Sequence, residues 1–170
     1  MFDPIIPHLM IVIAFMAIVL KAAISDMNTL RISNGDNAAL FILYPVYLSF
    51  TPATPDVLTA IGIAVLVLLI GFLLFSKGLL GGGDVKMLTA VSLWAGPELM
   101  GPFLMITAGA GGVLALVIVS RFHLEAAVLV HRCGAVRLSE AMTSHAMPYG
   151  AAIAAGAAFV SYRLFILGGA

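Results

Sequence analysis

Two aspartates, Asp26 and Asp84, are the residues whose type and position suggest chemistry. Asp26 follows one long apolar tract, and Asp84 precedes another, directly after the glycines at 81–83. Two carboxyl groups that face each other cannot both ionise easily, so one proton is shared between them. The ionised member can take a proton from water, while the protonated member gives one to a carbonyl oxygen. Peptide hydrolysis needs both roles, so the pair suggests an aspartic peptidase.

A structural role for the same residues is the alternative. An aspartate between glycines and an apolar run is often a helix N-cap, and Asp26 could be a solvated residue at the membrane interface. A helix N-terminus favours the ionised form of Asp84, whereas burial favours the neutral form. The sequence leaves open which aspartate holds the proton. Gly81, Gly82 and Gly83 carry no side chain, so we expect them to let a substrate backbone approach Asp84.

The composition is that of an integral membrane protein. Of 170 residues, 62% are hydrophobic and 9% are charged, whereas a soluble domain carries about 25% charged residues. Mean hydropathy is +1.16. The net charge is zero, which argues against nucleic acid as a partner. The single cysteine excludes a disulfide framework and a four-cysteine zinc site, and the histidines show no metal-binding spacing.

Six apolar segments are predicted to form membrane-spanning helices, in a single all-α domain that covers residues 1–170. A spanning helix needs roughly 20 apolar residues, and two of the segments are shorter than that. Since each short segment follows a polar loop, we expect the loops around residues 25–37 and 76–84 to feed a wet cavity at membrane depth. The six segments are Ile5–Ile24, Ala38–Phe50, Val57–Phe75, Val85–Ala95, Phe103–Ser120 and Met147–Leu167.

The lysines and arginines predict the orientation of these helices. Seven of the eight lie in or beside the loops after the first, third and fifth segments, and only Arg163 lies on the other side. Because positively charged loops stay in the cytoplasm, both termini are predicted to face outward. Asp26 and Asp84 then lie at one depth, at the cytoplasmic ends of two helices. The seven residues are Lys21, Arg31, Lys77, Lys86, Arg121, Arg132 and Arg137.

Three motifs resemble those of a known family. "GGGDVK", residues 81–86, resembles the GxGDVK form of the GxGD motif in prepilin peptidases, which are membrane-embedded aspartic peptidases. "ISDMNTLRISN", with Asp26, Arg31 and Asn34, is similar to the first aspartate motif of this family. "MPYGAAIAAG", residues 147–156, resembles its last-helix motif. The three motifs stand in the family's order and together cover the whole chain.

The resemblance implies a function and a site. It implies an aspartic endopeptidase of the bacterial inner membrane that removes the basic leader from pilin precursors at the cytoplasmic face. Asp26 and Asp84 are then the catalytic pair, and no cofactor is needed. The chain lacks a soluble insertion with four cysteines, so it resembles the short CpaA/TadV-type peptidases associated with Flp pili, and methylation of the new N-terminus is not expected. Ser33 replaces the family's usual proline before Asn34, which we expect to loosen this loop without loss of activity.

Further residues beside the acid pair have two interpretations each. Lys86 either tunes the acid pair or contacts an acidic substrate residue, or it is an interfacial lysine that extends to the membrane surface. Arg31 and Asn34 either orient their loop or bind the substrate backbone. Asp36 is expected to cap the second helix, since it precedes a helical apolar run. The last-helix motif contributes Pro148, Tyr149 and Gly150 as further site-supporting candidates.

Other parts of the chain favour packing and anchoring. Residues 121–145 are moderately amphipathic, so we expect them to lie on the cytoplasmic membrane surface. Cys133, within this segment, has no paired histidine context that would make it a nucleophile. Small residues at four-residue spacing, at Gly150, Ala154 and Ala158, predict close helix packing, with a homo-oligomer face as the alternative. The expected partners are a pilin precursor and the lipid bilayer.

A transporter and a non-catalytic assembly factor of a secretion system are the alternative functions. Broken helices, glycine runs and acids within the membrane also build ion sites. The two halves of the sequence show no inverted repeat, which counts against a transporter. An assembly factor would keep the fold without the chemistry. Loss of leader cleavage on substitution of the two aspartates separates a peptidase from both alternatives.

Overall fold

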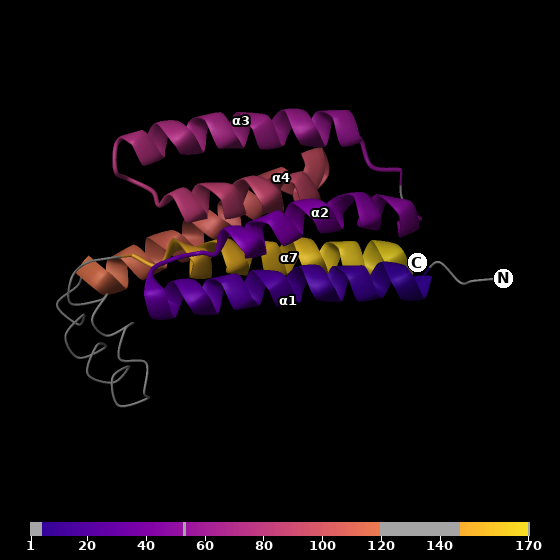
Figure 1. Ribbon diagram of the computed structural model, residues 1–170, viewed down its shortest axis with the longest axis horizontal. Coiled ribbons are helices and arrows are strands. Elements are labelled where there is room, and N and C mark those ends of the chain that lie inside the picture. The colour runs from indigo at the N-terminus through magenta and orange to yellow at the C-terminus, as the bar shows by residue number, and fades with distance from the viewer. Residues whose placement is uncertain (1–4, 53, 120–146, 170) are drawn as a thin grey trace.

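The computed structural model describes residues 5–52, 54–119 and 147–169, and all regular secondary structure in these ranges is helical. The helices pack side by side as a bundle (Figure 1). This confirms the predicted all-α class. Four of the helices, all except α2, are long and apolar enough to cross a membrane. The helices are α1 (Ile5–Thr29), α2 (Asn34–Phe50), α3 (Val57–Ser76), α4 (Gly82–Val119) and α7 (Tyr149–Gly169).

The predicted surface anchor at residues 121–145, together with Cys133, lies outside the described residues. The described chain resumes at Met147, ahead of α7.

Helix α4 is bent into two parts at Gly96. This residue has φ 57° and ψ −170°, a backbone conformation that is not helical and that glycine adopts readily. The two parts run in opposite directions, so both ends of α4 lie at the same end of the bundle (Figure 1). The predicted break at this position is confirmed, but Pro97 and Pro102 lie within the helical second part rather than in a loop.

Several predicted helix boundaries are wrong near the acid pair. Helix α1 continues to Thr29 instead of ending at Ile24, and α2 begins at Asn34 instead of Ala38. The N-cap of α2 is Ser33, whose hydroxyl accepts a hydrogen bond from the Gly35 backbone N–H at 3.1 Å. Asp36 is therefore not the cap. Most of the polar stretch after the first apolar segment is helical, and only a short connection at residues 30–33 remains.

An aromatic cluster forms the core at the end of the bundle away from the acid pair. Phe15 of α1 stacks on Trp94 of α4, with ring centroids 4.4 Å apart. Tyr44 and Tyr47 of α2 pack against the same indole ring, at 5.7 and 5.1 Å. The Trp94 N–H donates to the Leu40 carbonyl at 3.0 Å, which satisfies the one polar atom of this side chain. The cluster therefore fixes α1, α2 and the first part of α4 to one another.

Close packing of α7 on the second part of α4 depends on Gly156. A Cβ atom at this position would lie 2.7 Å from Phe103 Cδ2 and would also overlap the Thr107 hydroxyl. We therefore expect Gly156→Ala to destabilise the protein by about 1–3 kcal/mol, the usual cost of overpacking. Thermal unfolding in detergent measures this effect. Gly109→Ala is the control, because a Cβ there meets nothing within 4 Å; equal melting temperatures for the two variants would contradict the prediction.

Candidate active site

Asp26 lies in the last turn of α1 and is held by the start of α7. The side chain is buried, with 4% exposed, and its Oδ2 accepts a hydrogen bond from the Gly150 backbone N–H at 2.8 Å. A Cβ atom at Gly150 would lie 2.9 Å from both the Cβ and the Oδ2 of Asp26. Only glycine allows this approach, so the last-helix motif and the first aspartate motif meet directly in the structure.

Asp84 lies in the first turn of α4 and is 8% exposed. One carboxylate oxygen, Oδ2, lies against the Gly81 backbone, where an added Cβ would come within 2.5 Å of it. The other oxygen, Oδ1, is buried and has no hydrogen-bond partner among the residues that the structure describes. A buried acceptor without a partner is costly.

The fold brings the two aspartates together. Both line a cavity of about 260 Å³ between the connection at residues 30–32 and the glycines at 81–83. Both also line a second cavity, of about 290 Å³, whose other side includes Leu79 and Tyr149. A cavity between the two polar connections is thus present, with both acids in its wall. Its hydration and its depth in a membrane stay predictions.

Two of the three glycines before Asp84 belong to a helix. Gly82 and Gly83 are the first two residues of α4. A Cβ at Gly83 would lie 3.0 Å from Ile32 Cβ and 3.4 Å from the Ile32 backbone, so this glycine lets the first motif pack closely on α4. Gly82 faces Phe75 at an ordinary distance of 3.4 Å. The run therefore serves close packing of the chain on itself, and access for a substrate backbone stays a prediction.

Lys86 and Arg31, the two basic candidates near the acids, lie on the surface of the protein. Lys86 is exposed, and its ammonium group donates to Asn34 Oδ1 at 2.8 Å. Arg31 is exposed and lines the smaller cavity, while its carbonyl accepts hydrogen bonds from the hydroxyls of Ser25 at 3.1 Å and Thr29 at 3.3 Å. These contacts show how the connection between α1 and α2 is held, and they give Lys86 a partner that the sequence did not indicate.

Pro148 and Tyr149 from the last-helix motif have different surroundings. Pro148 is fully buried just before α7, whereas Tyr149 is half-buried and lines the larger cavity with Met147. Pro148 therefore contributes packing, and Tyr149 is the member of this motif that borders the space next to the acids.

Two residues of the site were missed by the sequence analysis. Leu30 lines both cavities with φ 53°, a left-handed conformation that is uncommon for leucine and costs roughly 1–2 kcal/mol. No residue type signals this, since glycine is the usual choice at such a helix end. Asn37 is 3% exposed and donates from its amide to the Gly83 carbonyl at 3.3 Å. A polar residue at the start of an apolar helix was the available signal.

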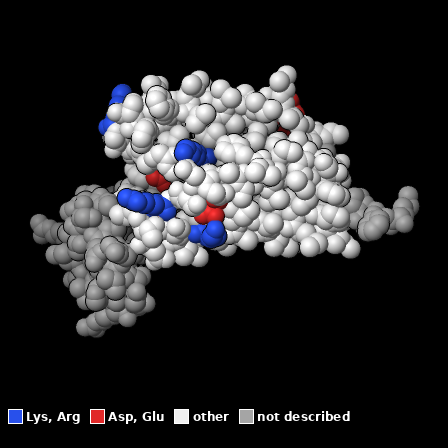
Figure 2. Space-filling model, viewed as in Figure 1, with Lys and Arg blue, Asp and Glu red and all other residues white. Residues whose placement is uncertain are grey.

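Charged side chains gather at the acid end of the bundle. Figure 2 shows the lysines and arginines of this face near that end, with carboxylates between them, while most of the remaining surface is uncharged. Lys21 forms an ion pair of 2.6 Å with Asp36 there. This distribution is typical of a protein whose middle lies in a bilayer and whose charged end meets water.

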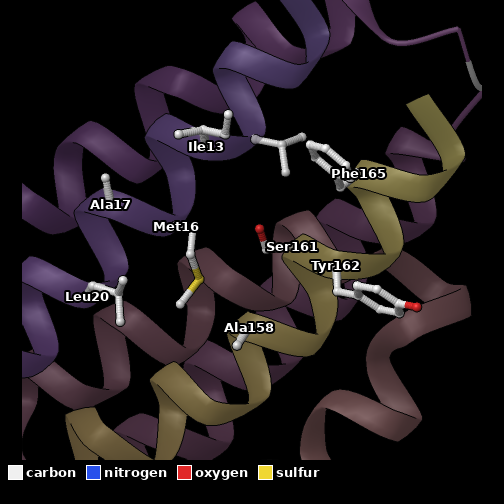
Figure 3. Close-up of a pocket in the computed structure, with 9 residues that line it drawn as sticks. Ile13, Met16, Ala17, Leu20, Ala158, Ser161, Tyr162 and Phe165 are labelled. Atoms are coloured by element: carbon white, nitrogen blue, oxygen red, sulfur yellow. The ribbon is translucent and has the colours of Figure 1, made fainter. Parts of the chain in front are cut away.

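A groove between α1 and α7 has a different character. Its volume is about 440 Å³, and it is lined by apolar side chains such as Met16, Leu20 and Phe165. Figure 3 shows them with the Ser161 hydroxyl and with Tyr162. No carboxylate lines this groove, so it lacks the pair of carboxyl groups that an aspartic peptidase needs. Asp26 and Asp84, the aspartates that the sequence singles out, instead line the cavities at the acid end of the bundle.

Comparison with known proteins places the chain in a family. Searches of curated proteins and of solved structures give no significant match. The model of the type IV leader peptidase family matches residues 12–116, which is more than half of the chain and includes both Asp26 and Asp84. The chain therefore belongs to the type IV leader peptidase family.

Proposed function

We propose that this protein is an aspartic endopeptidase that removes the basic leader from Flp-type pilin precursors at the cytoplasmic face of the bacterial inner membrane. Family membership supports a role as a prepilin peptidase. The observation that carries the aspartic mechanism is that Asp26 and Asp84, from two different helices, line the same two cavities.

The proposed reaction divides the work between the two carboxyl groups. The apolar helix of the precursor lies in the bilayer, and the scissile bond reaches the cavities in an extended form. One aspartate takes a proton from water, which attacks the carbonyl carbon, while the other gives a proton to the carbonyl oxygen. The C–N bond of the tetrahedral intermediate then breaks: the first aspartate gives its proton to the leaving nitrogen, and a hydroxyl of the intermediate returns a proton to the second. The Gly150 N–H fixes one Asp26 oxygen at 2.8 Å and so orients this carboxyl group. The reaction as proposed needs no metal and no organic cofactor.

The proposed membrane topology has six crossings, with both termini outside. The two antiparallel parts of α4 then count as two crossings, and α2, with 17 residues, spans about 26 Å at the usual rise per residue. Lys21, Arg31, Lys77 and Lys86 all precede or follow connections at the acid end, which places that end in the cytoplasm under the positive-inside rule. We further propose that the protein is a single peptidase domain without methyltransferase activity. It acts alone or as a homo-oligomer.

Leader cleavage by the purified protein tests the proposed function. The protein is reconstituted in liposomes with a Flp-type pilin precursor, and the products are identified by mass spectrometry. We expect a single cut that releases the leader, and no cut by the double variant Asp26→Asn/Asp84→Asn. Equal cleavage by the double variant would show that a contaminating protease is responsible. Proton or ion flux that needs both aspartates, without cleavage, would identify a transporter instead. Absence of both cleavage and flux, with pilus assembly that still requires the protein, would identify an assembly factor.

Labelling of single cysteines tests the orientation. In a Cys133→Ser background, cysteines at the exposed positions Lys77 and Asp56 mark the two ends of α3. We expect a membrane-impermeant maleimide to label Asp56→Cys in intact spheroplasts and to label Lys77→Cys only in inverted vesicles. The reverse pattern would place the acid pair outside the cytoplasm.

A further inference from the structure

We propose that the first turn of α2 is a clamp that sets the spacing of the two catalytic carboxyl groups. The clamp consists of Asn34, Asp36 and Asn37. This inference rests on the proposed peptidase function and assigns the three side chains a positioning role in it.

The helices that carry the two acids need such a connection. The backbones of α1 and α4 make little direct contact, whereas α2 and α7 each pack against both. Side chains such as Phe15 and Trp94 join α1 to α4 in the aromatic core, away from the acids. At the acid end, the distance between Asp26 and Asp84 is therefore set through α2 and α7. Helix α7 contributes the hydrogen bond from the Gly150 N–H, which holds Asp26 but not Asp84.

The clamp binds α1 through an ion pair. Asp36 accepts a hydrogen bond from the Lys21 ammonium group at 2.6 Å. The side chain of Asp36 is 8% exposed and that of Lys21 is 72% exposed, so a buried carboxylate meets a cation that reaches it from the surface. Lys21 precedes Asp26 by five residues, about 7.5 Å along the helix axis. The ion pair thus anchors α2 close to the first acid.

The same turn binds α4 on both sides of the second acid. Asn37 donates from its amide to the Gly83 carbonyl at 3.3 Å, directly before Asp84. Asn34 accepts from the Lys86 ammonium at 2.8 Å, two residues after Asp84. Ile32 packs closely on Gly83 next to these hydrogen bonds and limits how near α4 can approach this connection. Asp84 therefore lies between two points of α4 that are fixed to one turn of α2.

The expected consequence is an effect on the chemical step. Two carboxyl groups that act together on one water molecule tolerate little change in separation, and a misplacement of about 1 Å can cost about 10²-fold in rate. None of the three side chains lines either cavity that contains the acids. Loosening the clamp is therefore expected to lower kcat and to leave substrate binding, measured as KM, nearly unchanged.

Steady-state kinetics of leader cleavage test the clamp. Asn37→Leu keeps the approximate shape of the side chain and removes the donor to Gly83, and we expect kcat to fall about 10–100-fold with KM within about twofold. Asn34→Leu and Lys86→Met break the second bond, and we expect the double variant to be no slower than the slower single variant. Lys86→Arg keeps a donor for Asn34 and is expected to recover most of the rate lost in Lys86→Met.

Ser92→Ala is the matched control. Ser92 is fully buried on α4, the helix of Asp84 and Lys86. Among the described residues, its hydroxyl donates to the Leu88 carbonyl of the same helix at 2.6 Å. We expect this variant to lose some thermal stability and to keep kcat. If Asn37→Leu does not fold, the exposed pair Asn34 and Lys86 provides the test by itself.

The outcomes separate the clamp from the peptidase. Wild-type kcat in folded Asn37→Leu and Lys86→Met would reject the clamp while the peptidase stands. A rise in KM at constant kcat would also reject it, because the residues would then bind substrate. Absence of cleavage by the wild-type protein would reject the peptidase, and with it the clamp as a catalytic device.

Discussion

Replacement of either Asp26 or Asp84 by asparagine is expected to reduce leader cleavage by at least about 10³-fold, because a positioned acid or base contributes 10²–10⁴-fold and the two act as a unit. Asparagine has nearly the same shape as aspartate, so the fold and the cavities should persist. Its amide can neither accept a proton from water nor give one to a carbonyl oxygen. Both aspartates are at least nine-tenths buried in the wall of the same space, so bulk water cannot easily substitute for the missing group.

The measurement is the initial rate of leader release at saturating precursor. Rates are compared between variants whose melting temperatures equal that of the wild-type protein. Asp56→Asn is the matched control. Asp56 is exposed at the other end of the bundle and caps α3 by accepting from Thr59 N–H at 3.1 Å, and asparagine is an equally good cap. We expect wild-type activity for this control. More than a tenth of wild-type activity in either active-site variant would rule out a mechanism that needs two carboxyl groups.

Gly150→Ala is expected to have the second largest effect, a fall in kcat of about 10²-fold for a displaced catalytic group. The added methyl group would overlap Asp26, whose Cβ and Oδ2 both lie 2.9 Å from the position of the new atom. The Asp26 carboxyl group would have to move, and its 2.8 Å hydrogen bond from the Gly150 N–H would lengthen or break. Relief of this overlap by movement of α7 would also lower the melting temperature.

Gly112→Ala is a suitable control for this variant, because it lies on α4 with open space around the position of a Cβ atom. The two substitutions add the same atom to a helix, so any difference reports the contact with Asp26. Cleavage rates and thermal unfolding are measured for both. Equal rates would mean that the position of Asp26 does not depend on Gly150, and the assignment of Gly150 as a supporting residue would fail.

The family and the candidate acids were predictable from the sequence. The motifs around Asp26 and Asp84 resemble those of prepilin peptidases, and the family model that matches the chain is that of the type IV leader peptidases. The helical class followed from long apolar segments, since a backbone in lipid must satisfy its hydrogen bonds within a helix or a closed barrel. Both signals are local: a motif is a few adjacent residues, and a spanning segment is one continuous run.

The errors arose where polar residues join the helices. Asn34 looked like part of a loop and Asp36 like the cap of the second helix, yet both lie in the first turn of α2. They are stable there because Lys86 and Lys21 provide partners for them. These partners are 52 and 15 residues distant in sequence. No pattern within the polar stretch itself reveals a partner so far away. The start of α2 that helix propensity and hydropathy predict therefore lies later in the sequence than the observed start.

By itself, the sequence determined that the chain is a membrane protein built of helices, and it singled out Asp26 and Asp84 as the pair with catalytic potential. Only the tertiary structure decided how these acids are held. It placed Gly150 against Asp26, turned the glycine run into a packing surface for Ile32, and gave Lys86 a partner in Asn34. The physical reason is that hydropathy and motifs act over neighbouring residues, whereas the separation of two carboxyl groups on different helices depends on which third helix packs between them.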